Sequence, residues 1–197
     1  MMNASMSEHS RLLGAFVRKP TRTGAIAPSS RELAEVMIAE MELAAADTVV
    51  ELGAGTGVFT RLIAERAKPG ATVLAFEIDA RLAGELDGTI PGVRIVNDSA
   101  ERIADHLKTA GRASADSILS GLPWASFSRS LQQTLLASVL GALRPGGLFA
   151  TFAYIPAAWF PPGRRFRAML AGGFASVETT PVVWRNVPPA FVYRCRK

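Results

Sequence analysis

A short hydrophobic run that ends in a glycine-rich turn, residues 48–57, constrains the fold of this 197-residue chain more than any other feature. Val49, Val50 and Leu52 predict a strand that is buried on both faces. The three glycines that follow allow a sharp turn and leave bare backbone open to a ligand. Because a helix is expected directly after the turn, the run predicts an α/β fold with a nucleotide-type cofactor site at residue 53 and beyond.

The spacing of the glycines separates two cofactor classes. The dinucleotide pattern G-x-G-x-x-G needs a third glycine at position 58, which is Val58 here. The chain instead has G-x-G-x-G, with Glu51 two residues before the first glycine. This arrangement resembles motif I of the class I S-adenosylmethionine-dependent methyltransferases. The resemblance implies that S-adenosylmethionine is the cofactor and S-adenosylhomocysteine the product, whereas a glycine turn of some other α/β protein is the alternative.

Acidic residues follow the next two predicted strands. The strand at residues 72–77 ends in Glu77, where a carboxylate can accept hydrogen bonds from two ribose hydroxyls. Asp79 is the alternative, although an Asp before a helix is usually an N-cap. The resemblance implies an acid for the adenine amino group at Asp98, which could equally cap the next helix. The predicted cofactor-binding residues are Glu51, Gly53, Ala54, Gly55, Thr56, Gly57, Glu77, Ile78, Asp98, Ser99 and Ser120.

A fourth predicted strand, residues 116–119, runs into the sequence S-G-L-P-W at residues 120–124. In the resembled superfamily the loop at this place borders the substrate, and the adenine-N6 and rRNA methyltransferases carry N-L-P-Y or a close relative there. Gly121 stands at the Asn position, which argues against a nucleobase substrate. Trp124 stands at the Tyr position, where it could form a wall or face a cation. Ordinary packing of Trp124 is the alternative.

Composition predicts one globular domain, with 49% hydrophobic and 20% charged residues. A single cysteine, Cys195, cannot form an internal disulfide, and residues 1–10 lack the apolar core of a signal peptide, so a cytoplasmic, reducing compartment is expected. The longest uncharged stretch, residues 145–163, predicts strand, loop and turn rather than a spanning helix. Within the one domain, residues 1–45 are expected to form an amphipathic helix and a cap helix, and residues 46–197 the methyltransferase core.

Charge is unevenly distributed along the chain. Residues 1–31 carry a net charge of +4, residues 32–143 of −6, and residues 144–197 of +7. Two basic ends imply a negatively charged partner, either a phosphate backbone or an anionic membrane surface. A helix predicted over residues 7–18 has apolar residues on one face and basic residues at its margin, which favours the membrane surface. Packing of this helix on the same domain is the alternative.

Five blocks together resemble the soluble bacterial phospholipid N-methyltransferases, and they span nearly the whole chain. They are G-A-I-A-P-S-S at 24–30, E-L-G-A-G-T-G-V-F-T at 51–60, S-G-L-P at 120–123, L-R-P-G-G at 143–147 and V-W-R-N-V-P-P-A at 183–190. The resemblance implies methylation of phosphatidylethanolamine, through mono- and dimethyl intermediates, to phosphatidylcholine. The protein would act peripherally at the inner membrane, with a phospholipid substrate and an anionic membrane surface as partners, and with no nucleic acid and no obligate protein partner.

Aromatic and arginine residues after the predicted fifth strand, residues 148–154, suit a lipid headgroup. Arginine forks can bind its phosphodiester, and aromatic faces can meet its ammonium group. Methyl transfer to an amine asks for positioning and the loss of one proton, so Tyr154 and Ser120 are the catalytic candidates, and no metal is expected. The predicted substrate-binding residues are Gly121, Leu122, Pro123, Trp124, Trp159, Arg164, Arg165 and Arg185.

Two other functions stay open at this point. A nucleic-acid adenine methyltransferase is supported by a pI of about 10.0, but Gly121 and the lack of a separate nucleic-acid domain oppose it. A non-enzymatic membrane-binding protein would explain the basic amphipathic helix. It would not explain Glu51, Glu77 or the glycine turn.

The remaining expected elements complete a Rossmann-like, seven-stranded, mostly parallel sheet with an antiparallel last strand and helices on both faces. Ser29 and Glu32 have capping-box spacing at the start of a helix. A long helix over residues 127–143 is expected to end at the R-P-G-G turn. Residues 182–184 and 191–194 are expected to form the antiparallel pair that closes the sheet.

Overall fold

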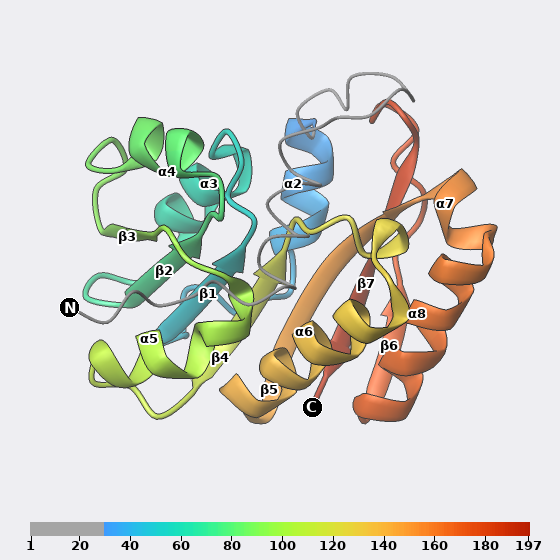
Figure 1. Ribbon diagram of the computed structural model, residues 1–197. Helices are drawn as coiled ribbons and strands as arrows, with labels where there is room; N and C mark the ends of the chain where they lie inside the picture. Colours follow the sequence, from blue (N-terminus) through green and yellow to red (C-terminus); the bar gives the residue numbers. More distant parts are fainter. Residues whose placement is uncertain (1–29) are drawn as a thin grey trace.

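A computed structural model describes residues 30–197, in which seven strands form one sheet in the order β3-β2-β1-β4-β5-β7-β6 (Figure 1). β1 to β5 pair in parallel, and β7 runs antiparallel to both of its neighbours. The predicted fold class is therefore confirmed. The strands are β1 (Thr48–Leu52), β2 (Thr72–Phe76), β3 (Val93–Val96), β4 (Ala115–Ser120), β5 (Leu143–Tyr154), β6 (Ser176–Thr179) and β7 (Ala190–Arg196).

Helices cover both faces of the sheet (Figure 1). α2 (Arg31–Ile38), α3 (Val58–Arg66) and α4 (Ala80–Leu86) lie on one face; α5 (Ile103–Thr109), α6 (Arg129–Ala142) and α8 (Pro161–Gly173) lie on the other. Short turns of helix, η1 (Ala100–Arg102), η2 (Trp124–Ser126) and α7 (Ile155–Trp159), connect these elements. Within residues 30–197 no helix combines the length and hydrophobicity needed to cross a bilayer.

The central strand β1 shows why its sequence is hydrophobic throughout. Val49 packs against the α2 and α3 side of the sheet, whereas Val50 and Leu52 pack against the α5 and α6 side. All three side chains are fully buried. A parallel strand covered on both faces needs apolar residues at consecutive positions, and this pattern made β1 predictable.

The edge of the sheet at β6 differs from the prediction. The expected strand at residues 182–184 is wrong, because Val183 makes only an isolated bridge to Ala190. β6 instead provides the edge, pairing with β7 from Ser176 to Thr179. Most of its side chains are exposed, so β6 lacks the hydrophobic run by which a buried strand is recognised.

The segment after β5 also differs from the prediction. Residues 155–163 form α7 and the start of α8 rather than a loop and turn. Pro156 lies in the first turn of α7, and Pro161 and Pro162 begin α8. Proline lacks an N–H, but the first helical positions have no intrahelical acceptor for it, so these prolines start helices.

Helix caps and ends lie close to the expected positions, with small corrections. The cap of α2 is Ser30, whose hydroxyl accepts a hydrogen bond from the Leu33 N–H at 3.1 Å, rather than Ser29. Ser128 caps α6 in the same way. The R-P-G-G residues belong to the beginning of β5. Ser29 itself and the helix expected over residues 7–18 lie outside the described residues.

Gly163 lets α7 pack tightly on α8. A Cβ there would collide with the carbonyl oxygen of Ala157 and lie 2.9 Å from the Cα of Ala158. We expect Gly163→Ala to lower the free energy of unfolding by about 1–3 kcal/mol, measured by urea denaturation. Gly172→Ala is the matched control, because a Cβ at this position of the same helix meets nothing within 4 Å. The control should be neutral or stabilising by up to about 1 kcal/mol, and equal stability of the two variants would contradict this packing.

Candidate cofactor and substrate site

The glycine turn after β1 adopts a backbone that side chains disfavour. Gly53, Gly55 and Gly57 have φ of +80°, +56° and +81°. A Cβ at Gly53 would lie 3.0 Å from Leu122, and one at Gly57 would lie 2.7 Å from Leu86. At Gly55 a Cβ would meet nothing within 4 Å. The turn is therefore packed on both sides but open at Gly55, where a ligand can approach the backbone.

Glu77 lies directly after β2 and is held by the same turn. Its Oε2 accepts a hydrogen bond from the Gly55 N–H at 2.8 Å, and its Oε1 accepts one from the Asp79 N–H at 2.8 Å. Each carboxylate oxygen has a second lone pair, so both can still accept from ribose hydroxyls. Asp79 caps α4 by accepting from the N–H groups of Arg81 and Leu82, as its alternative interpretation predicted.

Glu51, the acid of the predicted motif, is fully buried in β1. Neither carboxylate oxygen has a hydrogen-bond partner of good geometry among the described residues. Burial raises the pKa of Glu51 to about 7, the nearby Thr60 hydroxyl lowers it, and the negative charge of Glu77 raises it further. An unsatisfied carboxyl group beside an open backbone turn fits a ligand that carries positive charge, as S-adenosylmethionine does in its sulfonium and ammonium groups.

Asp98 and Ser99 follow β3 at the same edge of the sheet. The Asn97 side chain donates to the Glu77 carbonyl at 2.9 Å, which brings the two turns together. Ser99 caps η1, so the alternative that Asp98 is the cap is wrong. Asp98 Oδ2 instead contacts His106 Nε2 at 2.9 Å. His106 is half-buried, with its ring edge-on to Phe76.

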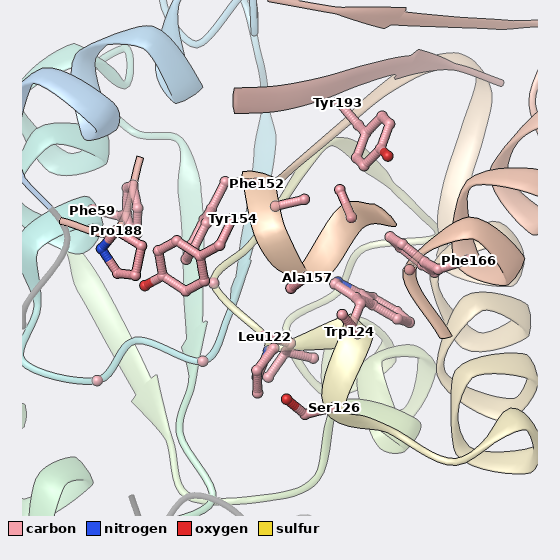
Figure 2. Close-up of a pocket in the computed structure, with 18 of the residues that line it drawn as sticks. Phe59, Leu122, Trp124, Ser126, Phe152, Tyr154, Ala157, Phe166, Pro188 and Tyr193 are labelled. Carbon is pink, nitrogen blue, oxygen red and sulfur yellow. The ribbon is translucent and has the colours of Figure 1, made fainter. Parts of the chain in front are cut away.

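A cavity of about 650 Å³ adjoins the open side of the glycine turn (Figure 2). Residues 53–56 form one wall, and the loop after β4, the end of β5, α7 and α8 form the others. None of the described residues that line it carries a charged side chain. Its aromatic residues are Phe59, Trp124, Phe152, Tyr154, Phe166 and Tyr193. The cavity can therefore accept a neutral or weakly hydrated group beside the cofactor turn.

Trp124 forms part of the cavity wall and is 3% exposed. Its indole Nε1 donates to Ser120 Oγ at 3.0 Å, and its ring stacks on Phe166 at 4.5 Å between centroids. Ser120 is fully buried and does not line the cavity. The structure thus uses the Ser120 hydroxyl to hold Trp124 in position.

Gly121 lies where the loop after β4 touches the glycine turn. Its N–H donates to the Leu52 carbonyl at 2.8 Å, and a Cβ at Gly121 would lie 2.9 Å from the Gly53 carbonyl oxygen. An asparagine at this position would force the two loops apart. Leu122 and Pro123 continue the loop and line the cavity.

Tyr154 ends β5 and lines the cavity from the side opposite Trp124 (Figure 2). Its ring packs edge-on against Phe152 at 5.4 Å. Burial raises the pKa of Tyr154, so its hydroxyl is neutral at physiological pH. A neutral hydroxyl can orient an amine through a hydrogen bond but does not act as a strong base.

The structure does not bring Trp159, Arg164, Arg165 and Arg185 into the cavity. Trp159 is 75% exposed, and Arg164 and Arg185 are exposed as well. Arg165 is half-buried and donates to Gln132 Oε1 at 2.9 Å. Gln132 in turn donates to the Trp124 carbonyl at 2.7 Å, so Arg165 supports the wall from behind.

Several residues at the site come from distant segments and were not predicted from the sequence. Phe59, Phe152, Phe166 and Tyr193 complete the aromatic wall from four different elements. Buried Asn186 accepts from the Ser30 N–H at 2.9 Å and donates to the Pro188 carbonyl at 2.7 Å. Ser30, in the block at 24–30, is therefore joined to the block at 183–190, two residues of which, Val187 and Pro188, line the cavity. Both blocks belong to the five that carry the family resemblance, and this was the signal in the sequence that could have indicated a contact between them.

Several known methyltransferases are similar to this chain in sequence or in fold. The family model for ribosomal RNA adenine dimethylase matches residues 29–97. Ornithine lipid N-methyltransferase from Singulisphaera acidiphila is 33% identical over 97% of each chain. Ribosomal RNA small subunit methyltransferase A from Thermotoga maritima is 33% identical over 55% of this chain and 37% of its own. An O-methyltransferase from Bacillus cereus, solved with S-adenosylhomocysteine, has a TM-score of 0.66 over 98% of this chain and 93% of its own, at 14% identity.

The match to ornithine lipid N-methyltransferase spans both the glycine turn and the C-terminal residues that line the cavity. The chain belongs to this family of S-adenosylmethionine-dependent N-methyltransferases. The ribosomal RNA family model covers the part of the methyltransferase from α2 to β3, which holds the cofactor turn and Glu77. The residues at this edge that could hold S-adenosylmethionine are the predicted ones: Glu51, residues 53–57, Glu77, Ile78, Asp98 and Ser99.

The buried carboxyl of Glu51 predicts that cofactor affinity depends on pH. Because its pKa is about 7, Glu51 is mostly neutral at pH 6 and mostly ionised above neutrality, and the ionised form attracts a cation. We expect affinity for S-adenosylmethionine, measured by titration calorimetry, to rise by up to about eightfold from about pH 6 to about pH 7.5. Glu51→Gln should bind more weakly and lose this dependence. The same pH dependence in the Gln variant would contradict a role for Glu51.

Proposed function

We propose that this methyltransferase transfers methyl groups to the primary amine of a membrane lipid headgroup. The observation that carries the proposal is the aromatic cavity beside the glycine turn, whose described lining residues include no charged side chain. The relative that matches over 97% of both chains is named for a lipid N-methyltransferase activity. A lipid amine needs a small neutral pocket next to the cofactor and an opening that faces the bilayer.

The chemistry requires a neutral amine with a free lone pair. S-adenosylmethionine, when bound, supplies an electrophilic methyl group. An alkyl ammonium has a pKa near that of lysine, ~10.4, and burial without a carboxylate lowers the pKa of such a group. Entry into the cavity therefore favours release of the ammonium proton to solvent. In the first two transfers, when the neutral amine still has an N–H, the Tyr154 hydroxyl can then accept a hydrogen bond from it and direct the lone pair toward the methyl group.

The aromatic lining also suits the products. Each methyl group makes the amine larger and less able to donate hydrogen bonds, and a third leaves a permanent cation. Faces of aromatic rings attract quaternary ammonium groups through cation–π interactions. Phe59, Phe152 and Tyr154, which lie on one side of the cavity, provide such rings (Figure 2). The cavity is thus suited to successive methylation of one headgroup.

Phosphatidylethanolamine is the substrate that we propose, methylated at the inner face of the membrane toward phosphatidylcholine. The five sequence blocks support this headgroup, whereas the full-length relative favours ornithine lipid as a second candidate. Both headgroups present a primary amine on a short chain. A nucleic-acid adenine is opposed by Gly121, since a Cβ at this position would lie too close to the Gly53 carbonyl oxygen for an asparagine to fit without a backbone shift.

Methyl transfer from radiolabelled S-adenosylmethionine tests the proposal. Parallel reactions contain vesicles with phosphatidylethanolamine, vesicles with ornithine lipid, or RNA, and thin-layer chromatography separates mono-, di- and trimethylated lipids. We expect label in phosphatidylethanolamine and its methylated derivatives. Label in ornithine lipid alone would replace the headgroup but keep the lipid-amine proposal. Label in RNA alone would overturn it.

A second test concerns Tyr154. Tyr154→Phe removes only the hydroxyl and keeps the ring contact with Phe152. We expect kcat to fall about 10- to 100-fold, since the amine is no longer oriented, while affinity for S-adenosylmethionine is unchanged. Tyr193→Phe, which removes a hydroxyl elsewhere in the cavity wall, should cause a smaller loss. Equal rates for Tyr154→Phe and the unaltered protein would exclude the hydroxyl from catalysis.

A further inference from the structure

Two short segments carry the large hydrophobic side chains that stand out on the described surface. Trp159 is 75% exposed and Phe160 63%, both at the junction of α7 and α8. Trp184 is 72% exposed and Val187 73%, both in the loop between β6 and β7. Exposed apolar groups of this size, gathered together, mark an interaction surface.

The two segments are neighbours at the cavity. The Ile155 N–H at the start of α7 donates to the Pro189 carbonyl at 3.0 Å, which joins α7 to the β6–β7 loop. Both lie at the same end of the sheet (Figure 1). Ala157 and Ala158 of α7 line the cavity, as do Val187 and Pro188 of the loop. Because Val187 lines the cavity and is also exposed, the cavity reaches the surface between these segments.

Positive charge accompanies the exposed hydrophobic residues. Arg164 and Arg167 in α8 and Arg185 in the loop are exposed. The sequence from 117 to 177 contains no Asp or Glu. Among the described carboxylates, none lies within 4.0 Å of these three arginines. Their charge is therefore available to an anionic partner.

We propose that this surface, the docking rim, lies against an anionic lipid bilayer and presents the opening of the cavity to the headgroups. The docking rim consists of Trp159, Phe160, Trp184 and Val187 together with Arg164, Arg167 and Arg185. Tryptophan and phenylalanine partition into the headgroup boundary, where arginine forks bind lipid phosphates. The inference rests on the proposed function, because a lipid amine reaches the cavity only if its opening faces the membrane.

Three residues of the docking rim receive a different role from the one that the sequence predicted. Trp159, Arg164 and Arg185 were predicted from sequence to bind the substrate headgroup. They do not line the cavity, although each lies one or two positions along the chain from a residue that does. The rim also adds a membrane contact beyond the helix that the sequence predicts over residues 7–18. Its aliphatic Val187 favours a bilayer over nucleic acid, because single-stranded nucleic acid needs ring faces on which to stack.

Tryptophan fluorescence tests the orientation of the full-length protein directly. Trp159→Phe leaves Trp184 as the exposed reporter, with Trp124 buried. The vesicles contain phosphatidylcholine and phosphatidylglycerol but no amino lipid, with and without bromine on the acyl chains. We expect a blue shift and quenching by the brominated lipid. The control, Trp159→Phe/Trp184→Phe, should show little quenching, and vesicle binding without quenching of Trp184 would overturn the proposal.

Sedimentation with the same vesicles measures the contribution of the rim. Phe160→Ser/Trp184→Ser should weaken vesicle binding by about tenfold or more, because two large aromatic groups are lost from the interface. Arg185→Ser should also weaken it, whereas Arg81→Ser, an exposed arginine on α4, should not. Calorimetry should show unchanged affinity for S-adenosylmethionine in all of these variants. Unchanged vesicle binding of the double variant would overturn the proposal.

Activity measurements separate failure of the rim from failure of the proposed function. If the rim variants bind vesicles and methylate vesicle lipid like the unaltered protein, the docking proposal fails and the function stands. If no detergent-dispersed amino lipid is methylated although Trp184 is quenched by brominated vesicles, the function fails and docking stands. Loss of self-association or of RNA binding in the rim variants, without loss of vesicle binding, would assign the surface to another partner and overturn the proposal.

Discussion

The contact between the glycine turn after β1 and the loop after β4 determines the rest of the site. The Gly121 N–H donates to the Leu52 carbonyl, and a Cβ at Gly121 would lie 2.9 Å from the Gly53 carbonyl oxygen, too close for a side chain to fit without a backbone shift. In the same turn, the Gly55 N–H donates a hydrogen bond to the Glu77 carboxylate. This packed junction therefore places the glycine turn and Glu77 next to the cavity that the loop after β4 helps to form.

The cavity beside this junction determines which protonation state of an amine can bind. Because none of the described lining residues is charged, binding favours the uncharged form of an amine, which is the form that can attack a methyl group. The walls are held by a second layer, in which Ser120 fixes Trp124 from one side and Arg165 acts through Gln132 from another. The enzyme would thus work mainly by positioning and desolvation.

The sequence predicted the half of the fold that is built from buried parallel strands. β1 and β2 are buried hydrophobic runs followed by turn residues, so Glu51 and Glu77 could be placed at neighbouring strand ends along one edge of the sheet. The edge strand β6 has mostly exposed side chains and gave no such signal. The prolines at 156 and 161 begin helices, although proline in sequence also indicates a loop.

The cavity was harder to predict than the cofactor turn because its wall is assembled over long distances in sequence. Phe59, Phe152 and Tyr193 come from α3, β5 and β7, and which face each side chain takes depends on packing. The arginines after β5 were assigned to the headgroup because their chemistry suits it. Helix α8 turns Arg164 outward, whereas it buries Phe166 against Trp124.

A crystal structure of the protein with S-adenosylhomocysteine and a short-chain amino lipid would show whether the amine binds in the aromatic cavity beside the cofactor. We expect the ribose beside Glu77, the sulfur at the edge of the glycine turn that faces the cavity, and the lipid amine in the cavity within reach of the Tyr154 hydroxyl. An amine bound outside the cavity, or a nucleoside bound away from residues 53–57, would contradict this expectation.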